Sequence, residues 1–168
     1  MDEKLEKKER RSAFDAAADY LSRRARTCKE TRDYLRKKEY SEEEISEAVN
    51  KLLEYEYLDD ADYAKRYFEY GYSRMKGRRK IEAELMEKGV EASVIANACE
   101  DYFYENGARE YENALEIAQA EYERSGKNEA DEKLVGKVAR KLESKGYRTD
   151  DIYKVIAEMR RWKDSDEV

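Results

Sequence analysis

Two stretches in the middle of the chain decide the fold: YLDDADYA at residues 57–64 and MKGRRKIEAELMEKGV at residues 75–90. The first is a short acidic turn that leads into an aromatic segment. In the second, a basic turn around Gly77 precedes Ile81 and Leu85, whose spacing of four residues places them on one face of a helix. Gly89 follows where that helix should end, because glycine adopts a left-handed backbone without a Cβ clash. The two stretches predict a helix, a turn and a second helix.

This pattern occurs three times, which indicates an internal repeat. The three copies align on Leu35, Leu85 and Leu142. Each of these leucines is followed by a lysine after three residues and by an isoleucine after ten. The turn residue is glycine in the second and third copies but Glu39 in the first. Either a left-handed backbone costs about 1 kcal/mol there, or the first turn differs slightly from the other two. A further amphipathic segment precedes each pair of helices, so each copy is predicted to be a three-helix unit.

Local signals support helices throughout the chain. The sequence has no proline and seven glycines, and helix-forming residues dominate its 168 positions. Thr27 with Glu30, and Ser41 with Glu44, have the spacing of capping boxes. We therefore predict an all-α fold of three tandem three-helix units in an elongated, curved arrangement. The predicted units are residues 1–58 with a charged N-terminal extension, residues 59–106, and residues 107–168 with a frayed C-terminus.

The residues needed for enzymatic chemistry are scarce. The chain has no histidine, the commonest general base and metal ligand, and its two cysteines, Cys28 and Cys99, lie in helical patterns typical of core residues rather than of a disulfide. It contains neither of two glycine-rich phosphate-binding motifs, Gly-x-x-x-x-Gly-Lys-Ser/Thr and Gly-x-Gly-x-x-Gly. We predict no catalytic, cofactor-binding or metal site. No signal peptide or membrane-spanning run is visible, so we expect a cytoplasmic protein.

Charge is segregated along the chain, although the net charge is −6. Residues 42–62 contain nine acids and one base, Lys51, whereas basic residues gather on the segments that lead into the turns. One interpretation is that these are solvated helix faces with weak intrahelical pairs. The other is that the repeated basic faces contact phosphates or an acidic protein surface. The candidate contact residues are Arg23, Arg24, Arg26, Lys76, Arg78, Arg79, Lys80, Lys137, Arg140 and Lys141.

A helix-turn-helix transcription factor is an alternative for three-helix units of this size. In the first unit, the helix that would enter the major groove begins with Glu42, Glu43 and Glu44, which would repel phosphate. Asn50 is the only residue on that helix suited to read adenine. The sequence therefore argues against sequence-specific DNA recognition.

Three motifs resemble the regulatory protein RecX family, the modulators of the RecA recombinase. The first is ADYLSRRART at residues 18–27, and the third is KGYRTDDI at residues 145–152. The second is the central stretch, whose matching positions are Asp60, Tyr63, Ala64, Gly77, Ile81, Glu84, Leu85, Lys88 and Gly89. Departures from the family pattern are Glu39 and Glu56, where glycine is common, and the acidic net charge.

The resemblance implies a regulator without catalytic activity or cofactor. Family members bind the RecA–single-stranded-DNA filament in its helical groove and restrain strand exchange, ATP turnover and co-protease activity. The implied partner is therefore a RecA filament, and contact with single- or double-stranded DNA is left open. We expect a monomeric protein that does not bind a membrane. Among the motif residues, Tyr63, Ile81 and Leu85 are expected in the core. The alternatives are a DNA-binding helical module, or a helical protein-interaction scaffold, that acts without RecA.

Overall fold

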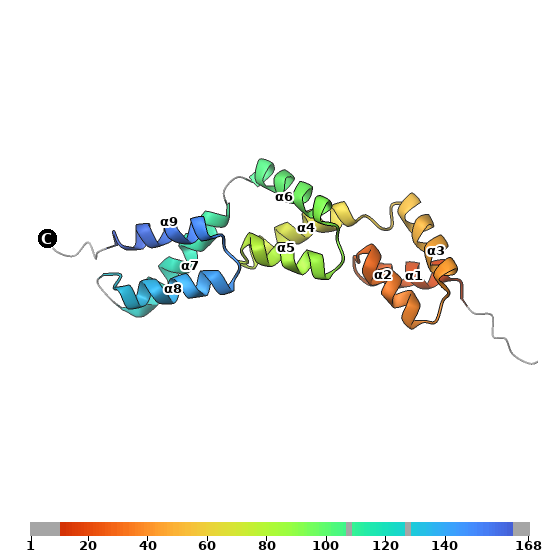
Figure 1. Ribbon diagram of the computed structural model, residues 1–168, viewed down its shortest axis with the longest axis horizontal. Coiled ribbons are helices and arrows are strands. Elements are labelled where there is room, and N and C mark those ends of the chain that lie inside the picture. Colours follow the sequence, from red (N-terminus) through yellow and green to blue (C-terminus); the bar gives the residue numbers. More distant parts are fainter. Residues whose placement is uncertain (1–10, 107–108, 127–128, 163–168) are drawn as a thin grey trace, which may run out of the picture. The chain divides into compact units, whose positions relative to one another are not determined.

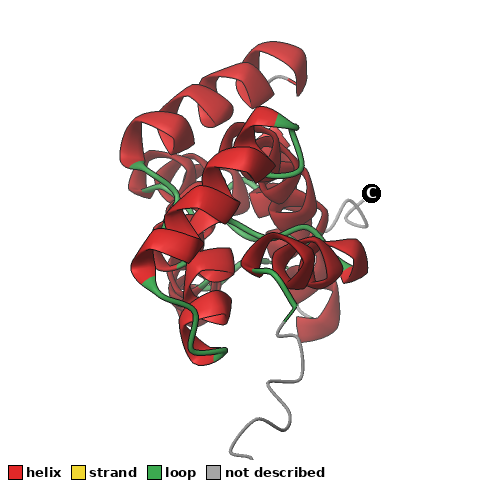
Figure 2. Cartoon of the chain, turned by 90° about the vertical axis from the view of Figure 1, so that its right-hand side faces the viewer, coloured by secondary structure: helices red, strands yellow, loops and turns green. Residues whose placement is uncertain are grey.

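A computed structural model describes residues 11–106, 109–126 and 129–162 of the chain. Within these ranges it contains nine helices and no strand (Figures 1 and 2), so the predicted all-α class is confirmed. The helices are α1 (Ala13–Arg23), α2 (Cys28–Lys37), α3 (Glu42–Glu54), α4 (Asp60–Ser73), α5 (Arg78–Glu87), α6 (Ala92–Asn106), α7 (Arg109–Ser125), α8 (Glu132–Ser144) and α9 (Thr149–Met159). The predicted fraying at the two ends falls on residues outside the described ranges.

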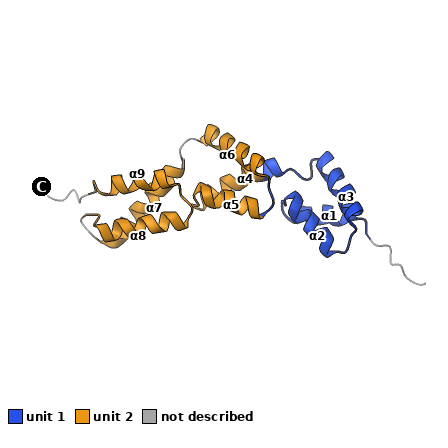
Figure 3. Ribbon diagram, viewed as in Figure 1, with its two compact units in different colours: residues 1–63, 88–90 blue, residues 64–87, 91–168 orange. Residues whose placement is uncertain are grey.

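The chain divides into two compact units (Figure 3). Unit 1 consists of residues 1–63 together with 88–90, and unit 2 of residues 64–87 together with 91–168. The three-part division into residues 1–58, 59–106 and 107–168 stays a prediction, as does the elongated, curved arrangement.

The core of unit 1 forms between α1, α2 and α3. Ala17, Leu35, Ile45, Val49 and Leu52 are all fully buried there. The three α3 residues are spaced at helical intervals, so one stripe of that helix faces inward while its acidic residues stay in water.

Unit 2 has an aliphatic cluster and an aromatic cluster. Ala118, Val138, Leu142, Val155 and Met159 fill the space between α7, α8 and α9. The aromatic cluster lies on α4 and α6, where the rings of Tyr72 and Tyr102 stack with centroids 4.8 Å apart and Phe68 lies against both rings.

The motif residues that we expected in the core differ in burial. Ile81 and Leu85 on α5 are fully buried, as expected. Tyr63 on α4 is only partly buried.

Both predicted capping boxes are present. The Thr27 hydroxyl accepts a hydrogen bond from the Glu30 amide at 3.2 Å, and the Glu30 carboxylate accepts one from the Thr27 amide at 3.1 Å. Ser41 and Glu44 form the same pair of bonds, at 3.2 Å to the Ser41 hydroxyl and 2.8 Å to the Glu44 carboxylate. These boxes satisfy backbone amides that have no partner within α2 and α3, and so set where both helices begin.

The helix-ending turns have the left-handed backbone that the repeat predicted. Glu39, Gly89 and Gly146 have φ angles of 62°, 80° and 82°. Glu56, which stands where the resemblance expects glycine, has a φ of 57°, and Met75 has a φ of 56°. The backbone geometry is therefore kept where the glycine is absent, at a cost of about 1 kcal/mol for each side chain.

Candidate interaction surface

In unit 1, a glycine turn packs against the start of α2. The Thr27 hydroxyl donates to the Lys88 carbonyl at 2.6 Å, and a Cβ added to Gly89 would lie 2.2 Å from the Lys29 side chain. An acidic residue completes the contact, because Asp60 Oδ1 accepts a hydrogen bond from the Cys28 amide at 2.9 Å. This carboxylate satisfies the first amide of α2, where the helix dipole also favours negative charge.

Unit 2 repeats this contact with different residues. The Gly77 amide donates to the Lys145 carbonyl at 2.8 Å, and the Arg79 amide donates to the Gly146 carbonyl at 3.0 Å. Glu110 Oε1 accepts from the Arg78 amide at 3.0 Å. The turn between α8 and α9 therefore lies against the start of α5, and this brings two basic segments of unit 2 next to each other.

Glu110 is the buried member of this contact, with 3% of its surface exposed. Burial raises the pKa of its carboxyl group, and nearby Asp151 acts in the same direction. The hydrogen bond from the Arg78 amide opposes that rise but does not cancel it. The acid is held in place by the helix end that it caps.

The candidate bases of unit 1 have different environments. Arg23 lies 3.6 Å from Asp19 and is largely exposed. Arg26 is covered, because its guanidinium lies 4.4 Å from the centre of the Tyr20 ring and 3.9 Å from the Glu30 carboxylate. Arg24 is exposed, and no ion pair within the described ranges uses its side chain.

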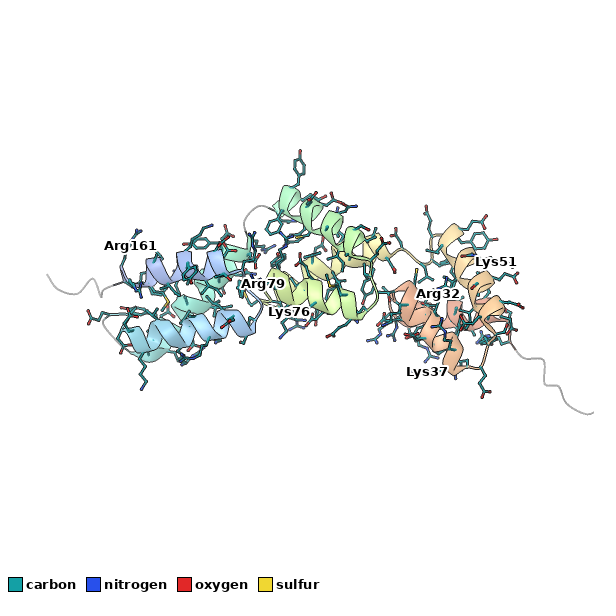
Figure 4. The ribbon with its side chains drawn as sticks, in the orientation of Figure 1. Arg32, Lys37, Lys51, Lys76, Arg79 and Arg161 are labelled. Atoms are coloured by element: carbon teal, nitrogen blue, oxygen red, sulfur yellow. The ribbon has the colours of Figure 1, made fainter. Side chains whose placement is uncertain are left out.

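Next to the basic turn of unit 2, two candidates are engaged and two are open. Lys76 pairs with Glu84 at 2.6 Å, and Arg78 pairs with Glu82 at 2.6 Å. Arg79 and Lys80 are exposed, and neither takes part in an ion pair among the described residues; Figure 4 labels Lys76 and Arg79.

The Lys76 pair affects the titration of its acid. Burial alone would raise the pKa of Glu84, but hydrogen bonds from Lys76 and Tyr67, together with the charge of Lys76, outweigh it and lower that pKa. Glu84 therefore stays ionised and holds Lys76 against α5.

On α8, two of the three candidates bind a buried acid. Glu121 has 2% of its side chain exposed, and its carboxylate lies 2.7 Å from Lys137 and 2.6 Å from both Lys141 and Arg124. Hydrogen bonds from Lys137 and Lys141 lower the pKa of Glu121 to about 2. Arg140 is exposed on α8 and has no ion pair in the described part of the chain.

The environments separate the ten candidates into two groups. Six have a carboxylate partner within the chain. Four are exposed and without an ion pair among the described residues: Arg24, Arg79, Lys80 and Arg140. We call these four the open bases; the first lies in unit 1 and the other three in unit 2.

Comparison with known proteins identifies the family. A family model described as the first three-helix domain of RecX matches residues 13–52, and a model of the second three-helix domain matches residues 59–98. The chain is 39% identical over 145 residues to "Regulatory protein RecX" of Clostridium botulinum. This alignment covers 86% of the chain and 66% of that relative. The chain belongs to the RecX family. The resemblance seen in the sequence motifs is confirmed.

Other RecX proteins agree. The chain is 36% identical to "Regulatory protein RecX" of Listeria welshimeri, over 83% of the chain and 51% of that relative. The chain thus spans about half to two thirds of the length of these curated RecX relatives. The crystal structure of RecX from Lactobacillus salivarius matches with a TM-score of 0.79 at 28% identity, covering 88% of the chain and 94% of the crystallised chain.

The sequence analysis did not predict that Asp60 and Glu110 would cap the helices α2 and α5. Asp60 and Glu110 each follow the amide that they cap by 32 residues. The signal available was this repeated spacing, with an acid in the first turn of α4 and of α7. Within the described ranges, no helix is long and apolar enough to cross a membrane, and no group of three or more potential ligand side chains could hold a metal ion.

Proposed function

We propose that this RecX-family protein regulates a RecA-type recombinase by binding the recombinase filament on single-stranded DNA. The family supports this proposal, since the similar proteins from Clostridium and Listeria are named regulatory proteins. In this proposal the protein acts as a monomer without catalysis or cofactor, and slows ATP hydrolysis, strand exchange and co-protease activity. Such a partner would place it in the cytoplasm.

One observation carries the surface assignment: the open bases Arg79 and Lys80 lie where the turn between α8 and α9 contacts the start of α5. An exposed cation without an internal partner can bind an external anion without first breaking an ion pair, whereas Lys76 or Lys137 must give up a carboxylate. We therefore propose the open bases as the contacts that matter most.

The test is single-stranded-DNA-dependent ATP hydrolysis by the cognate recombinase. The wild-type protein should slow it, and the double variant Arg79→Glu/Lys80→Glu should lose about tenfold or more in potency, because two attractive contacts become repulsive. Both positions are in the first turn of α5, where the helix dipole tolerates acids, so the fold should survive. Circular dichroism checks that it does.

The matched control is Arg160→Glu/Arg161→Glu, which makes the same change in charge at two exposed residues after α9. It should keep the activity of the wild type. Equal loss in both variants would reduce the effect to net charge and contradict the assignment. No slowing by the wild-type protein, even in excess, would reject the recombinase proposal.

The two alternatives give different results in the same preparation. A DNA-binding module acting without the recombinase would bind bare DNA as tightly as the filament, with a steep salt dependence. A scaffold for another protein would bind neither. The acidic first turn of α3 makes the DNA module the weaker proposal.

A further inference from the structure

Unit 1 has a hollow at the N-terminal end of α1, the end opposite Arg23. Its volume is about 510 Å³. It is lined by the first residues of α1 and by residues of α3 up to the C-terminal end of that helix. The residues that determine its chemistry are Phe14, Glu44, Glu47, Ala48, Lys51 and Tyr55. We call this hollow the α1–α3 groove. None of the ten candidate bases contributes to it.

Aromatic rings give the groove an apolar wall that is open to solvent. The rings of Phe14 and Tyr55 meet edge to face with centroids 6.2 Å apart, and Tyr55 is 59% exposed. Tyr57, 65% exposed, lies against Tyr55 with ring centroids 6.4 Å apart. Exposed tyrosines that gather beside a hollow are typical of anchor sites in protein interfaces, because the rings lose little conformational freedom when covered.

The charge of the groove selects its partner. Glu44 and Glu47 line it, and Lys51, the one cation among the described lining residues, is already paired with Glu47 at 2.9 Å. Of the acids in the first turn of α3, Glu42 is paired with Arg36 at 2.6 Å and Glu43 lies outside the groove lining. A phosphate backbone would be repelled here, whereas lysine or arginine side chains would be attracted.

The groove and the basic residues Arg23 and Arg24 lie at opposite ends of α1. Helix α1 has 11 residues, so a rise of about 1.5 Å per residue separates Ala13 from Arg23 by about 15 Å. Figure 4 shows Lys51 on α3, apart from Arg32 and Lys37 on α2. An anionic partner at Arg24 would therefore leave the groove free.

We infer that the α1–α3 groove binds a basic segment of a partner protein. One apolar or aromatic side chain of that segment packs against Phe14 and Tyr55. Flanking lysine or arginine side chains pair with Glu44, which also accepts the Ser41 amide, and compete with Lys51 for Glu47. This surface is a protein contact and is distinct from the open bases. The inference does not rest on the recombinase proposal, since it names the chemistry of the segment and not its owner.

The test uses synthetic peptides and the full chain. A fluorescent lysine-rich peptide with one central tryptophan is compared with the same peptide carrying serine at that position, and with a single-stranded oligonucleotide. Anisotropy titrations should give affinity for the tryptophan peptide about tenfold above that for the serine peptide, and the oligonucleotide, added to the protein without peptide, should leave the Phe14 and Tyr55 rings unaffected. Chemical shifts of the Phe14 and Tyr55 rings should change on binding.

Two variants locate the site. Glu47→Lys and Tyr55→Ser should each weaken the tryptophan peptide about tenfold. The matched control is Glu43→Lys, which makes the same charge change one turn earlier on α3, outside the groove lining. It should change the affinity less than about threefold.

Three outcomes would overturn the inference. The first is equal binding of the tryptophan and serine peptides, which would show non-specific charge attraction. The second is a change in the Phe14 and Tyr55 shifts when the oligonucleotide is added to the protein without peptide. The third is a change in the Phe14 and Tyr55 shifts with protein concentration alone, which would assign the groove to a second copy of the chain.

Discussion

Glu39 and Gly146 share a backbone conformation but differ in what surrounds them. Their φ angles are 62° and 82°, and Glu39 is exposed. A Cβ on Gly146 would lie 2.5 Å from the Lys80 backbone nitrogen, too close for any rotamer to relieve. Position 146 therefore requires glycine both for its left-handed backbone and for the close packing around it. At position 39 a side chain meets only the cost of the left-handed backbone.

This difference predicts that Gly146→Ala destabilises unit 2 by more than the roughly 1 kcal/mol of a left-handed alanine, to about 2 kcal/mol or beyond. Urea unfolding measures the loss. The control Glu39→Gly, which relieves strain but frees the unfolded chain, should change stability by less than about 1 kcal/mol. A Gly146→Ala loss of 1 kcal/mol or less would remove the packing role.

Glu121 predicts a specific pH response. Its folded pKa of about 2 lies below the ordinary value of 4.5, so its contribution to stability is complete above about pH 4.5. The contribution is lost as the pH falls through 2, because the unfolded chain binds the proton more readily. The unfolding free energy of wild type should fall over this range, and Glu121→Gln should flatten that fall. The control Glu143→Gln, at an exposed residue of α8, should have the same dependence of unfolding free energy on pH as the wild type.

At the scale of the element, the starts of α2 and α5 depend on acids from distant helices. Asp60 caps the first amide of α2 and Glu110 the first amide of α5. Since burial raises the pKa of Glu110, its charge costs stability at neutral pH, and the structural role belongs to its oxygen as acceptor.

Glu110→Ala should therefore cost about 1–2 kcal/mol, because the Arg78 amide loses its acceptor. Glu110→Gln keeps an acceptor without a buried charge and should cost less than the alanine variant. Unfolding free energies and hydrogen exchange of the Arg78 amide measure both. Glu112→Ala, at an exposed residue in the same turn of α7, is the control. Equal costs for Gln and Ala would contradict the acceptor role.

At the scale of the whole molecule, the number of available cations limits binding to a polyanion. The chain has 35 lysines and arginines against 41 acids, and only four of the ten candidate bases are open. Any binding to bare single-stranded DNA should then show a slope of log affinity against log salt near about −3, from about −0.7 per phosphate contact.

Glu121→Gln should steepen this slope to about −5, since Lys137, Lys141 and Arg124 would be released as three further cations. Salt titrations of both proteins measure the difference. Identical slopes would show that these three cations do not gain access to phosphate when Glu121 is neutral.

The helices were predictable because their signals are local. The caps at Thr27 and Ser41, the turn glycines and the apolar spacing all act within a few residues, so the sequence alone was sufficient for the all-α class and for the left-handed turns at Gly89 and Gly146, while at Glu39 it left the turn geometry open. The three motifs were likewise enough to recognise the family.

Which cations are open was a matter of tertiary structure. Lys141 meets an acid 20 residues away, and the acid that caps α5 is 32 residues away from its amide. A list of charges along the chain contains no such distances, since ion pairs between helices depend on which faces the core turns toward each other. The groove beside Phe14 and Tyr55 was invisible for the same reason: α1 and α3 meet only when their apolar stripes are buried together.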